Sequence, residues 1–138
     1  MRRALPLLAA LLLPLAAWAD TLGLHTATWH DRPGYRAATP GLYWRLDNGA
    51  TLGALSNSEG HFSAYAAWTW HTDEQRPLSA AVSAGLITGY SLAPVVPLIA
   101  PSVAVRLGEQ ATARLIVLPK WHAKQGATAA QLDFEWRL

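Results

Sequence analysis

His30 and the adjacent pair Asn57-Ser58 carry side chains that together could catalyse acyl transfer. An imidazole can act as the general base that removes a proton from a hydroxyl group. An amide beside it can orient the ring or donate a hydrogen bond to an oxyanion. Asn-Ser-Glu-Gly is also ordinary turn composition, so the sequence leaves a purely structural interpretation open. The histidines show no metal-ligand spacing, and we expect neither a metal nor a cofactor.

Prolines are the second feature, because a proline cannot donate the hydrogen bond that joins neighbouring strands. Pro94, Pro97 and Pro101 lie in the apolar run from 93 to 105, and Pro119 follows a second apolar run. In a closed wall of strands, such residues would weaken lateral pairing and open side entrances for a lipid tail. The alternative is that the prolines lie at strand ends, which suits Pro94 and Pro119 better than Pro97 and Pro101.

The elements that would position these residues are short strands in which apolar and polar residues alternate. The alternation is clearest over 42–47, 61–71, 78–87, 102–107 and 131–138, and weaker over 21–30, 50–56 and 111–118. Eight strands are predicted, with starts near residues 21, 42, 50, 61, 78, 95, 111 and 128. The chain after residue 19 shows neither a sustained helical period nor an apolar run that would span a membrane as a helix. The predicted fold class is all-β.

The charged residues of these strands all lie on the face opposite the more apolar one. They are Arg45, Asp47, Arg106, Arg114, Asp133, Glu135 and Arg137. A soluble barrel buries its apolar face, whereas a membrane barrel turns that face to lipid. We therefore expect an eight-stranded antiparallel up-and-down transmembrane β-barrel, with a small soluble β-barrel as the alternative. Small residues on the polar face could leave an interior cavity for an acyl chain; a fully packed interior is the alternative.

The lengths of the connections suggest which end of such a barrel faces outward. Residues 47–49 and 108–110 have the composition of tight turns, and longer links are expected at 31–39, 89–93 and 119–127. Outer-membrane barrels have short periplasmic turns and longer external loops, so the odd-numbered connections would lie outside. The aromatic residues expected at the outer rim are Trp29, Tyr35, Tyr90 and Trp121, and those expected at the opposite rim are Trp70 and Trp136.

The first 19 residues have the pattern of a secretory signal peptide. Arg2 and Arg3 precede an apolar stretch, and Ala17-Trp18-Ala19 places small residues where a signal peptidase cleaves. We therefore expect a leader over 1–19 and a single barrel domain over 20–138. The two arginines account for the net charge of +2, so the remaining chain is formally neutral and offers no basic surface to nucleic acid. The absence of cysteine excludes disulfides and thiolate metal sites.

Taken in order, these motifs resemble the outer-membrane lipid A palmitoyltransferases, the PagP family. Residues 28–30 are similar to the family's Thr-Trp-His, and residues 55–58 to its Phe-Lys-Asp-Ser segment, whose Asp and Ser are catalytic together with that His. Residues 93–102 resemble its proline-rich strand at a lateral gate, residues 117–119 its second gate, and residues 132–138 its terminal strand. The resemblance covers most of residues 28–138 and depends on the order and spacing of the motifs.

The resemblance implies an outer-membrane acyltransferase that moves a chain from a phospholipid donor to lipid A. His30 would be the general base, Ser58 the nucleophile or the residue that positions the ester, and Asn57 the group that orients His30 or binds the oxyanion. The gate residues would be Pro94, Pro97, Pro101 and Pro119, and Thr69 would lie at the floor of the acyl pocket. We also expect a monomer that the outer-membrane assembly machinery inserts.

This sequence departs from the family pattern in four respects. We expect the amphipathic helix that precedes the family's barrel to be missing, because the first strand is predicted to begin near residue 21. Asn57 stands where the family has Asp, Thr69 stands where it has Gly, and the first external loop is much shorter. Two alternative functions therefore stay open. One is a non-catalytic outer-membrane barrel with a structural or surface-interaction role, and the other is a lipid A deacylase-like hydrolase.

Overall fold

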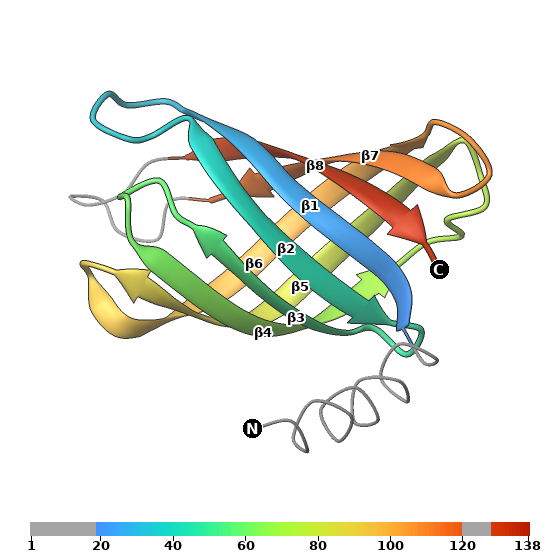
Figure 1. Cartoon of the computed structure of the whole chain (residues 1–138), viewed down its shortest axis with the longest axis horizontal. Helices are drawn as coiled ribbons and strands as arrows, with labels where there is room; N and C mark the ends of the chain where they lie inside the picture. The colour runs from blue at the N-terminus through green and yellow to red at the C-terminus, as the bar shows by residue number, and fades with distance from the viewer. Residues whose placement is uncertain (1–18, 120–127) are drawn as a thin grey trace, which may run out of the picture.

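A computed structural model describes residues 19–119 and 128–138, which form eight strands (Figure 1). The strands are β1 (Ala19–His30), β2 (Ala38–Leu46), β3 (Ala50–Ser56), β4 (Phe62–His71), β5 (Leu78–Tyr90), β6 (Ala93–Arg106), β7 (Ala111–Leu118) and β8 (Ala129–Arg137). Each begins within a few residues of its predicted start. The expected leader lies outside the described residues apart from Ala19, and so does Trp121. Within the described ranges, no helix is long and apolar enough to cross a membrane.

The eight strands close into a barrel in chain order. Every strand is antiparallel to its neighbours, and β8 closes the wall by pairing with β1 from Thr21↔Arg137 to His30↔Ala129. The β1–β2, β3–β4 and β5–β6 connections lie at one end, on the left in Figure 1, which we call the loop end. The C-terminus lies at the opposite, terminal end. The predicted all-β, eight-stranded antiparallel barrel is thus confirmed.

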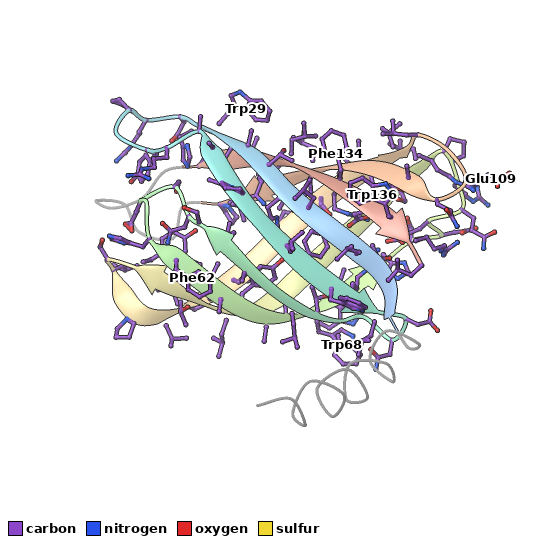
Figure 2. All side chains as sticks on the ribbon, in the orientation of Figure 1. Trp29, Phe62, Trp68, Glu109, Phe134 and Trp136 are labelled. Carbon is purple, nitrogen blue, oxygen red and sulfur yellow. The ribbon has the colours of Figure 1, made fainter. Side chains whose placement is uncertain are left out.

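The outside of the barrel wall is apolar. Leu52, Phe62 and Leu78 are each about two-thirds exposed. Trp29 and Trp68 project outward from the wall in Figure 2. Outward side chains of this kind occur on all eight strands, because alternate residues of each strand point away from the interior.

The inside of the barrel holds the charges. Arg45, Arg114, Asp133 and Glu135 are all buried, and Asp133 is fully inaccessible. The predicted sorting of strand charges is therefore confirmed for these four residues. The three other charges assigned to that face are exposed near the barrel ends: Asp47, Arg106 and Arg137.

The alternation of inward and outward side chains along β1 is interrupted near the middle of the strand. A β-bulge between His25 and Ala27 shifts the register of β1 against both β2 and β8. His25 is buried before the bulge, whereas beyond it Trp29 is 56% exposed and His30 lines the interior. Strict alternation from His25 would have placed His30 outside.

The fifth connection is shorter than expected. β5 and β6 extend to 13 and 14 residues, and only Ser91 and Leu92 join them. Tyr90 therefore belongs to β5 and packs against the interior side chains instead of forming part of an outer rim. Tyr35 likewise stacks on His30 at the interior. The expectation of an aromatic rim was wrong for these two tyrosines.

Candidate functional site

The half of the barrel toward the loop end is hollow. A cavity of about 520 Å³ opens between the connections and reaches the middle of the barrel. The wall formed by β3 to β6 is apolar and centres on Leu55, Ile87 and Val96. The opposite wall carries the polar side chains of Thr28 and Gln131, from β1 and β8. The volume falls in the range of small-molecule sites, so the interior is not the fully packed one that was the alternative.

His30 and Ser58 both line the mouth of this cavity, from the end of β1 and from the β3–β4 connection. The imidazole of His30 stacks on Tyr35, with ring centroids 4.8 Å apart and an angle of 17° between the planes. His30 lies beyond Trp29, on the side of the connections. There burial lowers the pKa of His30 below its usual value of 6.5, although the Asp31 carboxylate opposes this effect. A neutral imidazole at pH 7 is the form that a general base requires.

Hydrogen bonds between the connections hold the mouth together. The backbone N–H of Arg36 donates to the carbonyl oxygen of Ser58 at 2.8 Å, which ties the first connection to the third. The Glu59 carboxylate accepts bonds of 3.0 and 3.3 Å from the backbone and hydroxyl of Ser91, which ties the third to the fifth. Ser58 is therefore positioned by its neighbours on both sides.

Asn57 has a structural place in the third connection. Its side chain is fully buried, and its amide nitrogen donates to the Ser63 hydroxyl at 2.9 Å and to the Gly89 carbonyl at 2.8 Å. Its amide oxygen accepts from the backbone N–H groups of Glu59 and His61, both at 3.0 Å. These bonds occupy both ends of the amide, so the structure does not place Asn57 against His30 or at the cavity mouth.

The floor of the cavity is a hydrogen-bonded bridge from β8 through β1 to β4. Nδ1 of His25 donates to the Asp133 carboxylate at 2.9 Å, and the Tyr65 hydroxyl lies 2.8 Å from Nε2. Both nitrogens of the His25 ring therefore take part in the bridge. Tyr65 lies directly over Gly53, where any side chain would collide with its ring.

Thr69 lies beneath this bridge. Its hydroxyl is 3.0 Å from that of Thr51 and 2.7 Å from that of Ser83. It lines a separate small cavity of about 40 Å³. The structure therefore places the floor of the large cavity at His25 and Tyr65 and not at Thr69.

Ion pairs fill the barrel between this floor and the terminal end. Glu135 accepts from Arg114 Nε at 2.8 Å and from Arg45 Nη1 at 3.2 Å. Glu74 enters from the β4–β5 connection and accepts from Arg45 at 2.8 Å. A ligand of the large cavity would therefore enter from the loop end or through the wall.

The wall has a gap between β6 and β7. These strands pair from Ser102↔Ile116 to Arg106↔Thr112, and in the described chain residues 93–101 of β6 pair with β5 alone. Pro97 and Pro101 lie in this unpaired stretch, where they face Leu86 and Val82 of β5. We call it the β6–β7 seam.

The four prolines are all exposed, and they occupy two kinds of place. Pro97 and Pro101 are inside β6, so the strand-end alternative fails for them. Pro94 is the second residue of β6, and Pro119 directly follows β7 across the seam. Pro97 and Pro119 also line the cavity, so the interior approaches the outer surface at this seam.

The sequence reasoning missed the polar residues that line the cavity below its mouth. They are His25, Thr28, Thr39, Tyr65 and Gln131. The available signal was the alternation along β2, β4 and β8, which places Thr39, Tyr65 and Gln131 on the inward face of their strands. On β1 the bulge hid it, because His25 and His30 have opposite parity.

In comparisons with known proteins, no protein-family model matches the chain, and no curated protein matches it either.

Proposed function

We propose that this chain is an outer-membrane β-barrel that transfers a fatty acyl chain from a phospholipid to lipid A or a related lipid. The observation that carries the proposal is that His30, at the end of β1, and Ser58, in the β3–β4 connection, line the mouth of one interior cavity. A general base and a hydroxyl beside a deep, partly apolar pocket are what acyl transfer from a lipid requires.

The outer surface supports the membrane part of the proposal. Large apolar side chains are exposed around the barrel, while the strand charges are enclosed or lie near its ends. This is the reverse of a soluble barrel and the arrangement of an outer-membrane one. The leader predicted over 1–19 fits export to that membrane. We further propose that the outer-membrane assembly machinery inserts the chain and that it acts as a monomer, because one chain encloses the whole cavity.

In the proposed reaction, the acyl chain of the donor lies in the cavity with its ester at the mouth. His30 removes the proton from the acceptor hydroxyl, whose oxygen attacks the ester carbonyl carbon. The bond from that carbon to the glycerol oxygen then breaks, and the glycerol oxygen takes the proton from His30. The products are the acylated acceptor and a lysophospholipid. Ser58 positions the ester, or its own oxygen attacks first and forms an acyl-enzyme that the acceptor then cleaves.

The β6–β7 seam supports lateral entry of the donor. A phospholipid tail in the membrane reaches the cavity most directly where strands are not hydrogen-bonded, and Pro97 and Pro119 lie at the cavity there. If β6 and β7 were hydrogen-bonded along their whole length, the tail would have to leave the membrane and enter the cavity from the loop end.

The test is mass spectrometry of lipid A from cells that express the protein. We expect one added acyl chain with the parent and none with His30→Ala or Ser58→Ala. The matched controls are His61→Ala, an exposed histidine of the β3–β4 connection, and Ser56→Ala, which lies two residues from Ser58. Unmodified lipid A in cells that hold the folded parent would refute the transfer reaction.

A hydrolase would use the same two residues with water as the acceptor. It would release free fatty acid and leave no acylated acceptor, which the same extracts distinguish.

A non-catalytic barrel is favoured by one observation, the structural hydrogen bonds of Asn57, which leave His30 without the partner that the family pattern places there. A non-catalytic barrel would yield neither acylated lipid A nor free fatty acid. Any surface phenotype of the protein would then survive Ser58→Ala and would be lost only when the connections are deleted.

A further inference from the structure

Two arginines of the first connection lie at the mouth of the large cavity. Arg32 lines the cavity together with His30. Arg36 lies against the third connection, where its backbone N–H bonds the Ser58 carbonyl. Its guanidinium lies over Gly60, at which a Cβ atom would be only 2.8 Å from the Cζ atom of Arg36. Arg32 therefore accompanies His30, and Arg36 accompanies the segment that carries Ser58.

The carboxylates of the same region are engaged elsewhere. Asp31 accepts a bond of 3.0 Å from the backbone N–H of Thr128, and Glu59 accepts from the backbone and hydroxyl of Ser91. In the ranges that the structure describes, neither Arg32 nor Arg36 has an ion pair or a side-chain hydrogen bond. The mouth thus presents two exposed guanidinium groups whose donors are available to a ligand.

The interior arginines show by contrast what the fold does with a guanidinium that serves structure. Arg45 and Arg114 pair with buried carboxylates, and at the terminal end Arg106 donates to three backbone carbonyl oxygens. These three side chains link strands or connections to one another. No such structural contact accounts for the guanidinium donors of Arg32 and Arg36 within the described chain.

The chemistry of the two groups fits a lipid phosphate. A guanidinium presents a planar fork of N–H donors that matches the oxygens of a phosphate group. Trp29, which projects outward directly before His30, is of the residue type that lies at the head-group level of a membrane. In a phospholipid, the ester and the phosphate share one glycerol unit, so an ester held at His30 brings a phosphate to the mouth.

We propose that Arg32 and Arg36 form a binding site for the phosphate group of a lipid substrate. The phosphate belongs either to the phospholipid donor or to lipid A, and both present the same chemistry to the two arginines. This inference rests on the proposed function, because it assumes that a lipid substrate lies at the mouth. The site supplies binding and orientation, and no bond is made or broken at it.

The test measures lipid binding to the full chain by native mass spectrometry after release from non-ionic detergent micelles. One pair of probes is a dialkyl ether of phosphatidylglycerol and the dialkyl ether glycolipid in which glucose replaces the phosphoglycerol group. The other pair is lipid A and lipid A from which the phosphates have been removed. We expect the phosphate-bearing member of one pair to bind roughly tenfold more tightly, as two exposed charge pairs provide. The pair that shows this preference identifies the source of the phosphate.

Arg32→Gln and Arg36→Gln should each reduce that preference to about threefold, and the double variant should reduce it to about onefold. Arg76→Gln is the matched control, because it removes the same charge from an exposed arginine of the β4–β5 connection. It should leave the tenfold preference unchanged. All three positions are exposed, so we expect the variants to fold as the parent does.

Equal binding of both members in each pair by the parent would overturn the phosphate site, and so would a preference that survives the double variant. The outcome is separable from that of the proposed function, because the ether lipid contains no ester and binding needs no transfer. Acylated lipid A in cells, together with no phosphate preference, would overturn this inference alone. A phosphate preference in a protein that leaves lipid A unmodified would refute the transfer reaction and retain the site.

Discussion

His25 and His30 lie five residues apart on one strand, yet both face the barrel interior, because a β-bulge separates them. His25 closes the floor of the cavity, where Asp133 and Tyr65 hold its ring. His30 stands at the mouth, stacked on Tyr35. One irregular strand therefore supplies an imidazole to each end of the cavity. The partners of the two rings differ, and so should the consequences of removing them.

We expect alanine at these two positions to separate stability from activity. His25→Ala removes one of the two side-chain donors to the buried Asp133 carboxylate and leaves only Gln131, which should lower the free energy of unfolding by about 2 kcal/mol. His30→Ala should abolish acyl transfer and change that free energy by no more than about 0.5 kcal/mol. Urea unfolding and lipid A mass spectrometry measure the two quantities. Loss of both stability and activity in His30→Ala would contradict the separation.

Asn57→Asp tests whether this position acts on His30. If it did, restoring the aspartate of the family pattern should raise activity. The structure predicts the opposite, because a carboxylate has no proton for the Gly89 carbonyl and would face that oxygen at 2.8 Å. We expect a loss of about 1 to 3 kcal/mol in the free energy of unfolding and no gain in transfer rate. A more active and equally stable Asn57→Asp would give Asn57 a role at the site.

The strands were predictable because the two faces of the wall differ so strongly. Leu78, Val82 and Leu86 lie four residues apart on β5, a multiple of the two-residue period of a strand, and their outward exposure follows from that period. The burial of Asp133 and Glu135 followed from the same alternation on β8. Neither inference needed knowledge of long-range contacts.

The site was only partly predictable, since its geometry depends on irregularities and on contacts between distant strands. A regular period cannot locate the bulge beside Thr26, so alternation alone does not predict that His30 faces the interior. The floor at Tyr65 depends on Gly53 of the neighbouring strand and on His25 across the interior. The buried amide of Asn57 could not be distinguished from a catalytic one by composition.

The proposed general base predicts how activity depends on pH. Only neutral His30 can accept a proton, so the rate should fall as the pH drops through the pKa of this residue. Burial lowers that pKa below 6.5, so the fall should be centred below 6.5. Asp31→Asn removes the carboxylate that raises the pKa, and the fall should move to still lower pH. A midpoint above 6.5, or a shift toward higher pH in Asp31→Asn, would exclude His30 as the base.

The ion pairs below the floor predict a large effect on stability. Glu135→Gln removes the charge between two buried arginines, Arg45 and Arg114, and should lower the free energy of unfolding by about 3 kcal/mol. Asp73→Asn is the control, because its pair with Arg76 spans 3.9 Å at an exposed site and should be worth under about 0.5 kcal/mol. Urea unfolding measures both. Similar losses in the two variants would mean that the buried network contributes no more than a surface pair.

A disulfide across the β6–β7 seam tests whether the donor enters there. The chain has no cysteine of its own, so an engineered pair is the only thiol chemistry present. Pro101 and Val117 are the next positions in register beyond the last pair of the ladder, Ser102↔Ile116. Oxidised Pro101→Cys with Val117→Cys should therefore hold the seam shut and suppress acyl transfer, and a reductant should restore it.

The control pair is Val103→Cys with Leu115→Cys, which joins the same strands where they are already hydrogen-bonded. Oxidation there should leave transfer unchanged, because it constrains a part of the wall that is already closed. Mass spectrometry of lipid A before and after reduction gives the comparison within one sample. Full transfer with the seam disulfide formed would show that the donor reaches His30 from the loop end.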